Sequence, residues 1–186
     1  MNSTTALILI DIQNGLDELD YYGGARNNPF AESNARKILD FWREKKWPVF
    51  HIKHNSTSPD SPLRPNQPGN EIKEIVQPIA DEPIIGKNVN SAFIGTDLKE
   101  RLENQGIQKV VIVGLTTEHC ISTSTRMSAN LGFETTLISD ATAAFDKVSW
   151  DGKPIPAEIV HQVELANLNG EFARIIRTEE FLENLS

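Results

Sequence analysis

The sequence is poor in cysteine, in long apolar runs and in positive charge, and each shortage excludes something. Its 186 residues include one cysteine, so no intramolecular disulfide can form and a reducing compartment is favoured. Lys and Arg number 18 against 26 Asp and Glu, and the resulting net charge of −8 argues against a general nucleic-acid binder.

The amino-terminal segment also lacks the features of a targeting signal. No basic residue precedes its apolar stretch, which extends only over Ala6–Ile10. Such a stretch is too short for a signal peptide or a membrane span. We therefore expect a cytoplasmic protein without a membrane or nucleic-acid partner, in which the lone thiol stays reduced.

The remaining composition is that of an ordinary globular protein, with 39% hydrophobic and 24% charged residues. A chain of 186 residues is long enough to bury a substantial core by itself. We find no repeats, linkers or low-complexity segments, and predict a single domain over residues 1–186.

Short apolar runs alternate with amphipathic stretches along the chain. The pattern predicts strands at Thr5–Ile10, Pro48–Ile52, Pro83–Gly86, Lys109–Gly114, Glu134–Ser139 and Phe172–Ile176. It predicts helices at Phe30–Lys46, Gly95–Asn104, Ile155–Asn169 and Glu179–Leu185, with one more beginning near Cys120. This alternation predicts an α/β fold of three layers, with helices on both faces of a doubly wound six-stranded parallel sheet of order 3-2-1-4-5-6.

We predict three long loops, namely Gln13–Asn28, Asn55–Gly69 and Ala141–Pro156. All three lie on the carboxyl side of predicted strands, where open α/β sheets bind their ligands. Long loops in a compact domain are commonly functional. We therefore expect the ligand crevice at this edge of the sheet.

The lone cysteine follows a strand at this edge. The apolar run Val110–Val113 stops at Gly114, and helical spacing resumes soon afterwards, so Cys120 falls in the first turn or two of a helix. Unpaired N–H groups and the helix dipole favour a thiolate there. The alternative is that Cys120 simply packs in the core, as most lone cysteines do.

Two further ionisable groups end strands at the same edge, Asp11 after the first strand and Lys87 after the third. A carboxylate can accept a thiol proton, and an ammonium group stabilises both charges. Each residue also has an ordinary reading, Asp11 as a turn cap and Lys87 as a solvated lysine. Their joint placement with Cys120 favours one catalytic unit.

Several motifs occur in a fixed order: Asp11-x-Gln13, Lys87 followed by Ser91-Ala92-Phe93, Gly114–Cys120, Asp140–Ala144 and Pro156–His161. Each motif alone is weak. Their order and spacing, over nearly the whole chain, resemble those of the isochorismatase-like cysteine hydrolases, which include nicotinamidases and N-carbamoylsarcosine amidohydrolases.

This resemblance implies that Cys120 is the nucleophile, Asp11 the general base and Lys87 its ionic partner. It also implies a cis peptide bond between Leu115 and Thr116, and an oxyanion hole made by the N–H groups of Thr116 and Cys120. Members that hydrolyse the isochorismate vinyl ether lack the cysteine. Cys120 therefore favours C–N hydrolysis of a small amide, lactam or ureido substrate through a thioester.

The resemblance departs from nicotinamidases at their metal site. Nicotinamidases bind a divalent metal through an Asp-x-His pair after the second strand, where this chain has His51-Ile52-Lys53-His54. We therefore expect no metal and no other cofactor. The alternatives are a metal-assisted nicotinamidase-type amidase and a non-catalytic doubly wound binding module, although no nucleotide-binding glycine motif is present.

Four residues are candidates for the substrate pocket: Gln13, His54, Phe93 and Trp150. His54 is equally compatible with a surface position, and Trp150 with a subunit interface. We expect His161 to make a packing or subunit contact. The family resemblance also implies a homo-oligomer, either a dimer or a tetramer.

Overall fold

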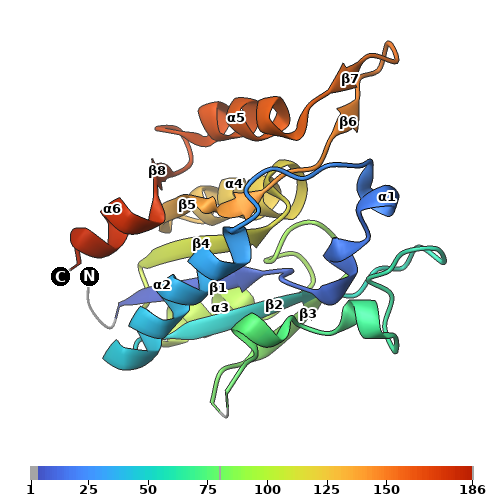
Figure 1. Cartoon of the computed structure of the whole chain (residues 1–186). Coiled ribbons are helices and arrows are strands. Elements are labelled where there is room, and N and C mark those ends of the chain that lie inside the picture. Colours follow the sequence, from blue (N-terminus) through green and yellow to red (C-terminus); the bar gives the residue numbers. More distant parts are fainter. Residues whose placement is uncertain (1–3, 80, 186) are drawn as a thin grey trace.

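The computed structural model describes residues 4–79 and 81–185. Six parallel strands form its central sheet, in the order β3-β2-β1-β4-β5-β8 (Figure 1). The strands are β1 (Thr5–Ile10), β2 (Val49–His54), β3 (Ile84–Lys87), β4 (Lys109–Leu115), β5 (Glu134–Ala143) and β8 (Arg174–Ile176). The predicted order is confirmed, because β8 is the sixth strand of this sheet.

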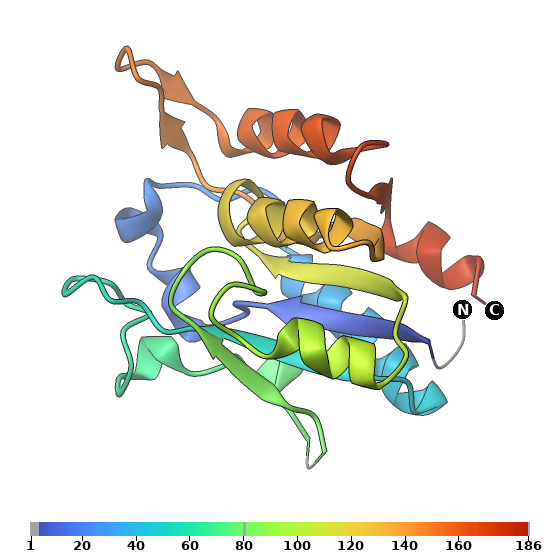
Figure 2. The same ribbon diagram turned by 180° about the vertical axis from the view of Figure 1, so that it is seen from behind.

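Helices cover both faces of the sheet, which confirms the three predicted layers (Figures 1 and 2). One face carries α2 (Ala31–Lys45) and α6 (Thr178–Glu183), and the other carries α3 (Leu98–Asn104), α4 (Ser122–Asn130) and α5 (Ala157–Leu168). Among the described residues, no helix is both long and apolar enough to cross a membrane.

The strand at the centre of the sheet shows why the two faces form separate cores. All six residues of β1 are buried, as expected for a parallel strand covered on both sides. Alternate side chains point to opposite faces, so Leu7 packs in the same core as Trp42 of α2, while Ile8 packs with Leu102 of α3.

The prediction of an irregular loop over Ala141–Pro156 is wrong in part. After a register shift, β5 pairs with β4 again through Thr142 and Ala143, so the strand continues past the polar residues Ser139 and Asp140. Beyond it, β6 (Lys147–Val148) and β7 (Pro154–Ile155) form a short antiparallel hairpin that extends from the body of the molecule (Figure 1).

The segment after β1 contains a short 3-10 helix, η1 (Asn14–Asp17), and α1 (Leu19–Tyr22). The segment after β2 is irregular up to two further 3-10 turns, η2 (Pro68–Asn70) and η3 (Glu74–Val76). In Figure 1, α1 and the irregular segment after β2 lie on the right, at the end of the sheet where the parallel strands terminate.

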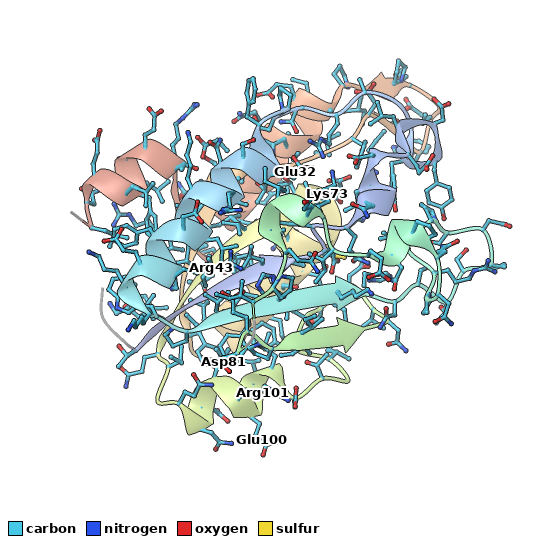
Figure 3. The ribbon with its side chains drawn as sticks, turned by 60° about the horizontal axis from the view of Figure 1, so that its bottom comes forward. Glu32, Arg43, Lys73, Asp81, Glu100 and Arg101 are labelled. Carbon is cyan, nitrogen blue, oxygen red and sulfur yellow. The ribbon has the colours of Figure 1, made fainter. Side chains whose placement is uncertain are left out.

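Glu32 at the start of α2 ties these segments together. Its carboxylate accepts hydrogen bonds from Arg26 at 2.7 and 2.8 Å and from Lys73 at 2.8 Å, and Figure 3 shows Lys73 beside it. Burial opposes ionisation of Glu32, but the two cations outweigh burial and lower its pKa to about 2. The connection therefore depends on an ionised carboxylate.

Candidate active site

Asp11 lies where β1 ends, at the centre of the carboxyl edge of the sheet. Its φ of 53° places it in the left-handed region, which Asp tolerates better than most residues. The Asp11 N–H donates to the Ile52 carbonyl at 2.9 Å, and its own carbonyl accepts from the Gln13 N–H at 2.9 Å. This tight turn leaves Asp11 only 1% exposed.

The strand that leads to Cys120 approaches the Asp11 turn very closely. A Cβ added at Gly114 would lie 2.0 Å from the carbonyl oxygen of Ile10, and Gly114 has a φ of 130°. Both the space and the backbone angle therefore require glycine here. This close approach brings β4 beside the carboxylate.

Cys120 lies in a π-helical turn, η4 (Thr117–Ile121), that leads directly into α4. The preceding peptide bond, between Leu115 and Thr116, is cis. The Thr116 carbonyl accepts hydrogen bonds from the N–H groups of His119 and Ile121, at 3.2 and 3.1 Å. The turn presents the Cys120 sulfur, in a side chain that is 9% exposed, toward the end of β1.

Lys87 is the last residue of β3 and contacts the other polar side chains of the site. Its Nζ donates to Asp11 Oδ2 at 2.6 Å, to His54 Nδ1 at 2.9 Å and to Cys120 Sγ at 3.2 Å. An ammonium group has three N–H donors, so these contacts use all of them. The structure thus brings together Asp11, Lys87 and Cys120, which are distant in the sequence.

The helix start favours a thiolate at Cys120, but the surroundings of this cluster favour the neutral thiol. Burial raises the pKa of the Cys120 thiol, and the Asp11 carboxylate raises it further, whereas Lys87 only partly compensates. Burial alone would lower the pKa of Lys87, but the nearby carboxylate and sulfur outweigh burial and raise it. The resting cluster therefore contains a neutral thiol beside an ion pair.

His54 completes the cluster as a neutral side chain. Burial, and secondarily the charge of Lys87, lower its pKa. Because Nδ1 accepts the proton-bearing Lys87 donor, the ring proton of the neutral imidazole lies on Nε2. His54 is thus a hydrogen-bond donor at its other nitrogen.

Asp11, His54 and Cys120 also carry the atom types that bind a metal ion. Ligand atoms of Asp11, His54 and Cys120 lie within 4.8 Å of one another, as they would around a cation. However, Nζ of Lys87 is within hydrogen-bond distance of all three residues and occupies the position that the cation would need. His51 is not a substitute ligand, because its Nε2 pairs with Glu82 at 2.8 Å. The residues do not fit a metal site.

A cavity of about 290 Å³ opens beside the cluster. It is lined by Asp11, Leu16, Tyr21, Tyr22, His54, Ser61, Leu63, Asn90, Leu115, Thr116, His119 and Cys120. The loops after β1 and β2 were predicted to border the crevice, and they supply the lining residues from Leu16 to Tyr22 and from Ser61 to Leu63. No spacing or motif could have identified these individual residues, because loop conformation alone decides which of them face the cavity.

Of the four residues predicted for the pocket, only His54 lines this cavity. Gln13 is buried and its amide holds the end of β2, through the backbone N–H and carbonyl of His54 at 2.7 and 3.0 Å. Phe93 packs in the core, where its ring stacks on Phe133. Trp150 is 99% exposed in the β6–β7 hairpin.

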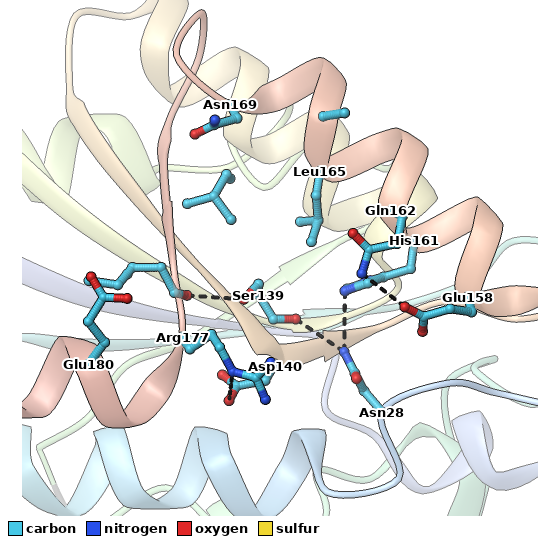
Figure 4. Close-up of a pocket in the computed structure, with 13 residues that line it drawn as sticks. Asn28, Ser139, Asp140, Glu158, His161, Gln162, Leu165, Asn169, Arg177 and Glu180 are labelled. Atoms are coloured by element: carbon cyan, nitrogen blue, oxygen red, sulfur yellow. Dashed lines mark hydrogen bonds and ion pairs between the residues drawn. The ribbon is translucent and has the colours of Figure 1, made fainter.

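A second, larger cavity of about 480 Å³ lies between α5, α6 and the ends of β5 and β8 (Figure 4). Polar groups of its lining already bond to protein atoms: Asp140 accepts from Thr178, and the Asn28 amide contacts His161 at 3.3 Å. The other ring nitrogen of His161 lies 2.9 Å from Thr117 Oγ1. His161 therefore makes the packing contact expected of it, whereas Asp11 and Cys120 line the smaller cavity.

The chain is similar to known proteins over almost its whole length. The model of the isochorismatase domain matches residues 5–180. The isochorismatase family protein YrdC of Bacillus subtilis is 49% identical over 184 residues, which span 99% of this chain and 97% of YrdC. Nicotinamidase 3 of Arabidopsis thaliana is 28% identical over 193 residues, spanning 97% and 88% of the two chains.

Solved structures give the same result. The crystal structure of an isochorismatase-family protein from Chromobacterium violaceum superposes with a TM-score of 0.94 at 38% sequence identity. The match covers 99% of this chain and 94% of the other. The likeness therefore includes the loops around the cavity as well as the central sheet.

Proposed function

Since this chain belongs to the isochorismatase family of hydrolases, we propose that it is a cysteine hydrolase that cleaves a C–N bond of a small amide, lactam or ureido compound. One observation carries the proposal: Lys87 Nζ lies 2.6 Å from Asp11 Oδ2 and 3.2 Å from Cys120 Sγ at the floor of a cavity. A nucleophile, a base and a balancing charge are thus in contact.

In the first step, Asp11 accepts the thiol proton as Cys120 Sγ attacks the substrate carbonyl carbon. Asp11 Oδ1 is buried and has no hydrogen-bond partner among the described residues, so it is free to take this proton. A C–S bond forms and the carbonyl π electrons move to oxygen. The N–H groups of Thr116 and Cys120 would stabilise this oxyanion, each by about 3 kcal/mol in the transition state.

In the second step, the tetrahedral intermediate collapses and the C–N bond breaks. The leaving nitrogen takes the proton that Asp11 received, so the products are a free amine or ammonia and a Cys120 thioester. Water then gives one proton to Asp11 and attacks the thioester carbonyl. Breaking the C–S bond releases a carboxylic acid, and the proton on Asp11 returns to the sulfur.

Lys87 acts through charge throughout this cycle. Its ammonium is held by Asp11 and lies against the sulfur, so it stabilises the thiolate as that charge develops. A metal-assisted nicotinamidase-type reaction is the second candidate. The position of Lys87 argues against a metal-assisted reaction, and no step is assigned to a metal.

We also propose that the protein is a homo-oligomer. Trp150 and Val148 in the β6–β7 hairpin are 99% and 73% exposed, and Ile159 and Val163 expose apolar surface on the adjacent α5. Exposed apolar groups concentrated in this way are typical of subunit interfaces. Light scattering should give a dimer or tetramer that Trp150→Asp dissociates, whereas a monomeric wild type would refute the proposal.

The hydrolase proposal is tested by following products and the thioester together. The purified protein is incubated with a panel of small carboxamides, lactams and ureido compounds, and amine or ammonia release is measured. For each compound that is hydrolysed, rapid acid quenching and mass spectrometry should show the acyl group on the peptide containing Cys120. Cys120→Ala should abolish release, whereas Thr123→Ala on the adjoining helix α4 should not.

Two outcomes would contradict this proposal. Turnover that survives Cys120→Ala would exclude the thioester route. Failure of the whole panel, together with an intact cellular phenotype for Cys120→Ala, would favour the alternative of a non-catalytic binding module.

A further inference from the structure

The amide side chain of Asn90 lies beside the nucleophile, in the loop that follows β3. Its Oδ1 accepts a hydrogen bond from the Cys120 thiol, with 3.8 Å between the oxygen and the sulfur. Asn90 is an exposed residue that lines the cavity, so a molecule in the cavity can reach its amide. No step of the proposed cycle uses this group.

The backbone of Asn90 is attached to the helix that follows the catalytic turn. Its carbonyl accepts a hydrogen bond from Ser124 Oγ of α4 at 3.4 Å, and the same hydroxyl oxygen accepts from the Ala92 N–H at 3.0 Å. These contacts hold the loop against α4 and involve no side-chain atom of Asn90. Substitutions of the side chain should therefore leave the loop in place.

Two oxygen acceptors thus lie near the sulfur, and the thiol has a single hydrogen to donate. In the resting site the thiol donates to Asn90 Oδ1. A carboxylate oxygen of Asp11 also lies within 4.8 Å of Cys120 Sγ, and Asp11 Oδ1 has no hydrogen-bond partner among the described residues. Because an acceptor of the S–H hydrogen stabilises the neutral thiol, this hydrogen must turn from Asn90 toward Asp11 before the sulfur attacks.

A substrate with an N–H group on its scissile nitrogen would cause this change. In the tetrahedral intermediate that nitrogen is two bonds from Cys120 Sγ, and is therefore near both oxygen acceptors. Its N–H can donate to Asn90 Oδ1 in place of the thiol, and the thiol hydrogen is then left to Asp11. The same contact keeps the nitrogen near the carboxylate that later protonates it. Esters and tertiary amides have no such N–H.

We propose that Asn90 is a further catalytic residue, whose amide oxygen accepts the thiol hydrogen at rest and the N–H of the scissile nitrogen when a substrate is bound. The site then favours primary and secondary amides over tertiary amides. This inference deepens the proposed hydrolase function and rests on it. The proton still passes from Cys120 to Asp11 and from Asp11 to the leaving nitrogen.

The first measurement follows the thiol and needs no substrate. Methyl methanethiosulfonate is a small neutral reagent without an N–H, and its reaction with Cys120 is followed by intact mass at pH 7. Loss of the acceptor in Asn90→Ala should make this reaction about two- to fivefold faster, because S–H is a weak donor. Asn90→Asp keeps an acceptor but adds a negative charge, and should react about tenfold more slowly. The same substitutions at Asn88, an exposed residue of this loop outside the cavity lining, should change the rate much less.

The second measurement compares two substrates that differ only in the group tested. They are the N-methyl amide and the methyl ester of one acyl group, taken from a panel amide that the wild type hydrolyses. The ratio of kcat/KM for the amide to kcat/KM for the ester should fall about two- to tenfold in Asn90→Ala, because the ester never used the acceptor. Asn90→Asp should retain the wild-type ratio, and so should Asn88→Ala. A merely structural role of Asn90 would lower both kcat/KM values together.

Either of two results would overturn the inference while the hydrolase proposal stands. One is an Asn90→Ala variant whose thiol reacts at the wild-type rate or more slowly, which would show that the amide does not hold the thiol hydrogen. The other is an unchanged ratio of amide to ester hydrolysis in that variant. A wild type that hydrolyses no compound of the panel would instead overturn the hydrolase proposal, and this inference with it.

Discussion

Replacing Asp11 by Asn should move two activities of Cys120 in opposite directions. The Asp11 carboxylate raises the pKa of the thiol, so its removal should increase the thiolate fraction near neutral pH. The same carboxylate is proposed to deliver a proton to the leaving nitrogen. Alkylation, which requires only a thiolate, should therefore become faster while hydrolysis becomes slower.

The magnitude follows from the geometry. A carboxylate oxygen of Asp11 and Sγ of Cys120 lie within 4.8 Å of each other. At an effective dielectric constant of about 20, two charges at this separation repel by about 3 kcal/mol, which corresponds to roughly a hundredfold in thiolate fraction. Because the nucleophilicity of a thiolate falls with its pKa, the net gain in alkylation rate is roughly tenfold.

The assay is simple because Cys120 is the only cysteine in the chain. Second-order rate constants with iodoacetamide are measured from pH 6 to pH 9 by intact mass, for the wild type and for Asp11→Asn. Asp20→Asn, an exposed carboxylate on α1, is the control for a change in net charge. On a substrate from the amide panel, kcat/KM should fall by about 100-fold or more in Asp11→Asn.

Alkylation that is slower in Asp11→Asn than in the wild type would refute this reasoning. It would mean that Asp11 promotes ionisation of the thiol, or that Lys87 loses its proton once its partner is gone. Hydrolysis that survives the substitution would refute the role of Asp11 as the proton carrier.

Three further predictions concern stability and metal dependence. Glu32→Gln should destabilise the protein by about 3 kcal/mol at pH 7, because the folded pKa of Glu32, about 2, lies below its ordinary value of 4.5; this difference should disappear as pH falls from 4.5 toward 2 in urea unfolding. Gly114→Ala should cost about 4 kcal/mol or prevent folding, whereas Gly132→Ala, also at positive φ but with nothing within 4 Å of its added Cβ, should cost much less. Prolonged dialysis against a chelator should leave hydrolysis unchanged, because Lys87 occupies the centre of the candidate ligand set; activity restored only by a divalent cation would contradict this.

The sheet could be predicted from the sequence because its strands are continuous apolar runs separated by amphipathic helices. The prediction failed at β5, where Ser139 and Asp140 interrupt the apolar run but the strand resumes pairing after a register shift. Such a shift depends on the neighbouring strand, where Gly114 allows the backbones of β1 and β4 to approach. A pattern read along one strand does not contain this information.

The candidate site, like the sheet, could be predicted from the sequence only in part. Asp11, Lys87 and Cys120 could be placed together because each follows a strand of one parallel sheet. The protonation state of Cys120 could not be predicted, because burial overcomes the effect of the helix start on the pKa of the thiol. Tyr22 carried no sequence signal at all, since its place in the cavity lining depends on how the 4-residue helix α1 folds.

The contacts of Lys87 separate catalysis from substrate recognition. Its three N–H groups are all bonded to protein atoms, on the ends of β1 and β2 and on the turn before α4, so it has none left for a substrate. Substrate recognition then falls to the other residues of the cavity lining, several of which, including Tyr22 and Ser61, come from the loops after β1 and β2. Changes in these loops should therefore alter which amide is bound while leaving the pH dependence of Cys120 alkylation unchanged, whereas changes at Asp11 should do the reverse.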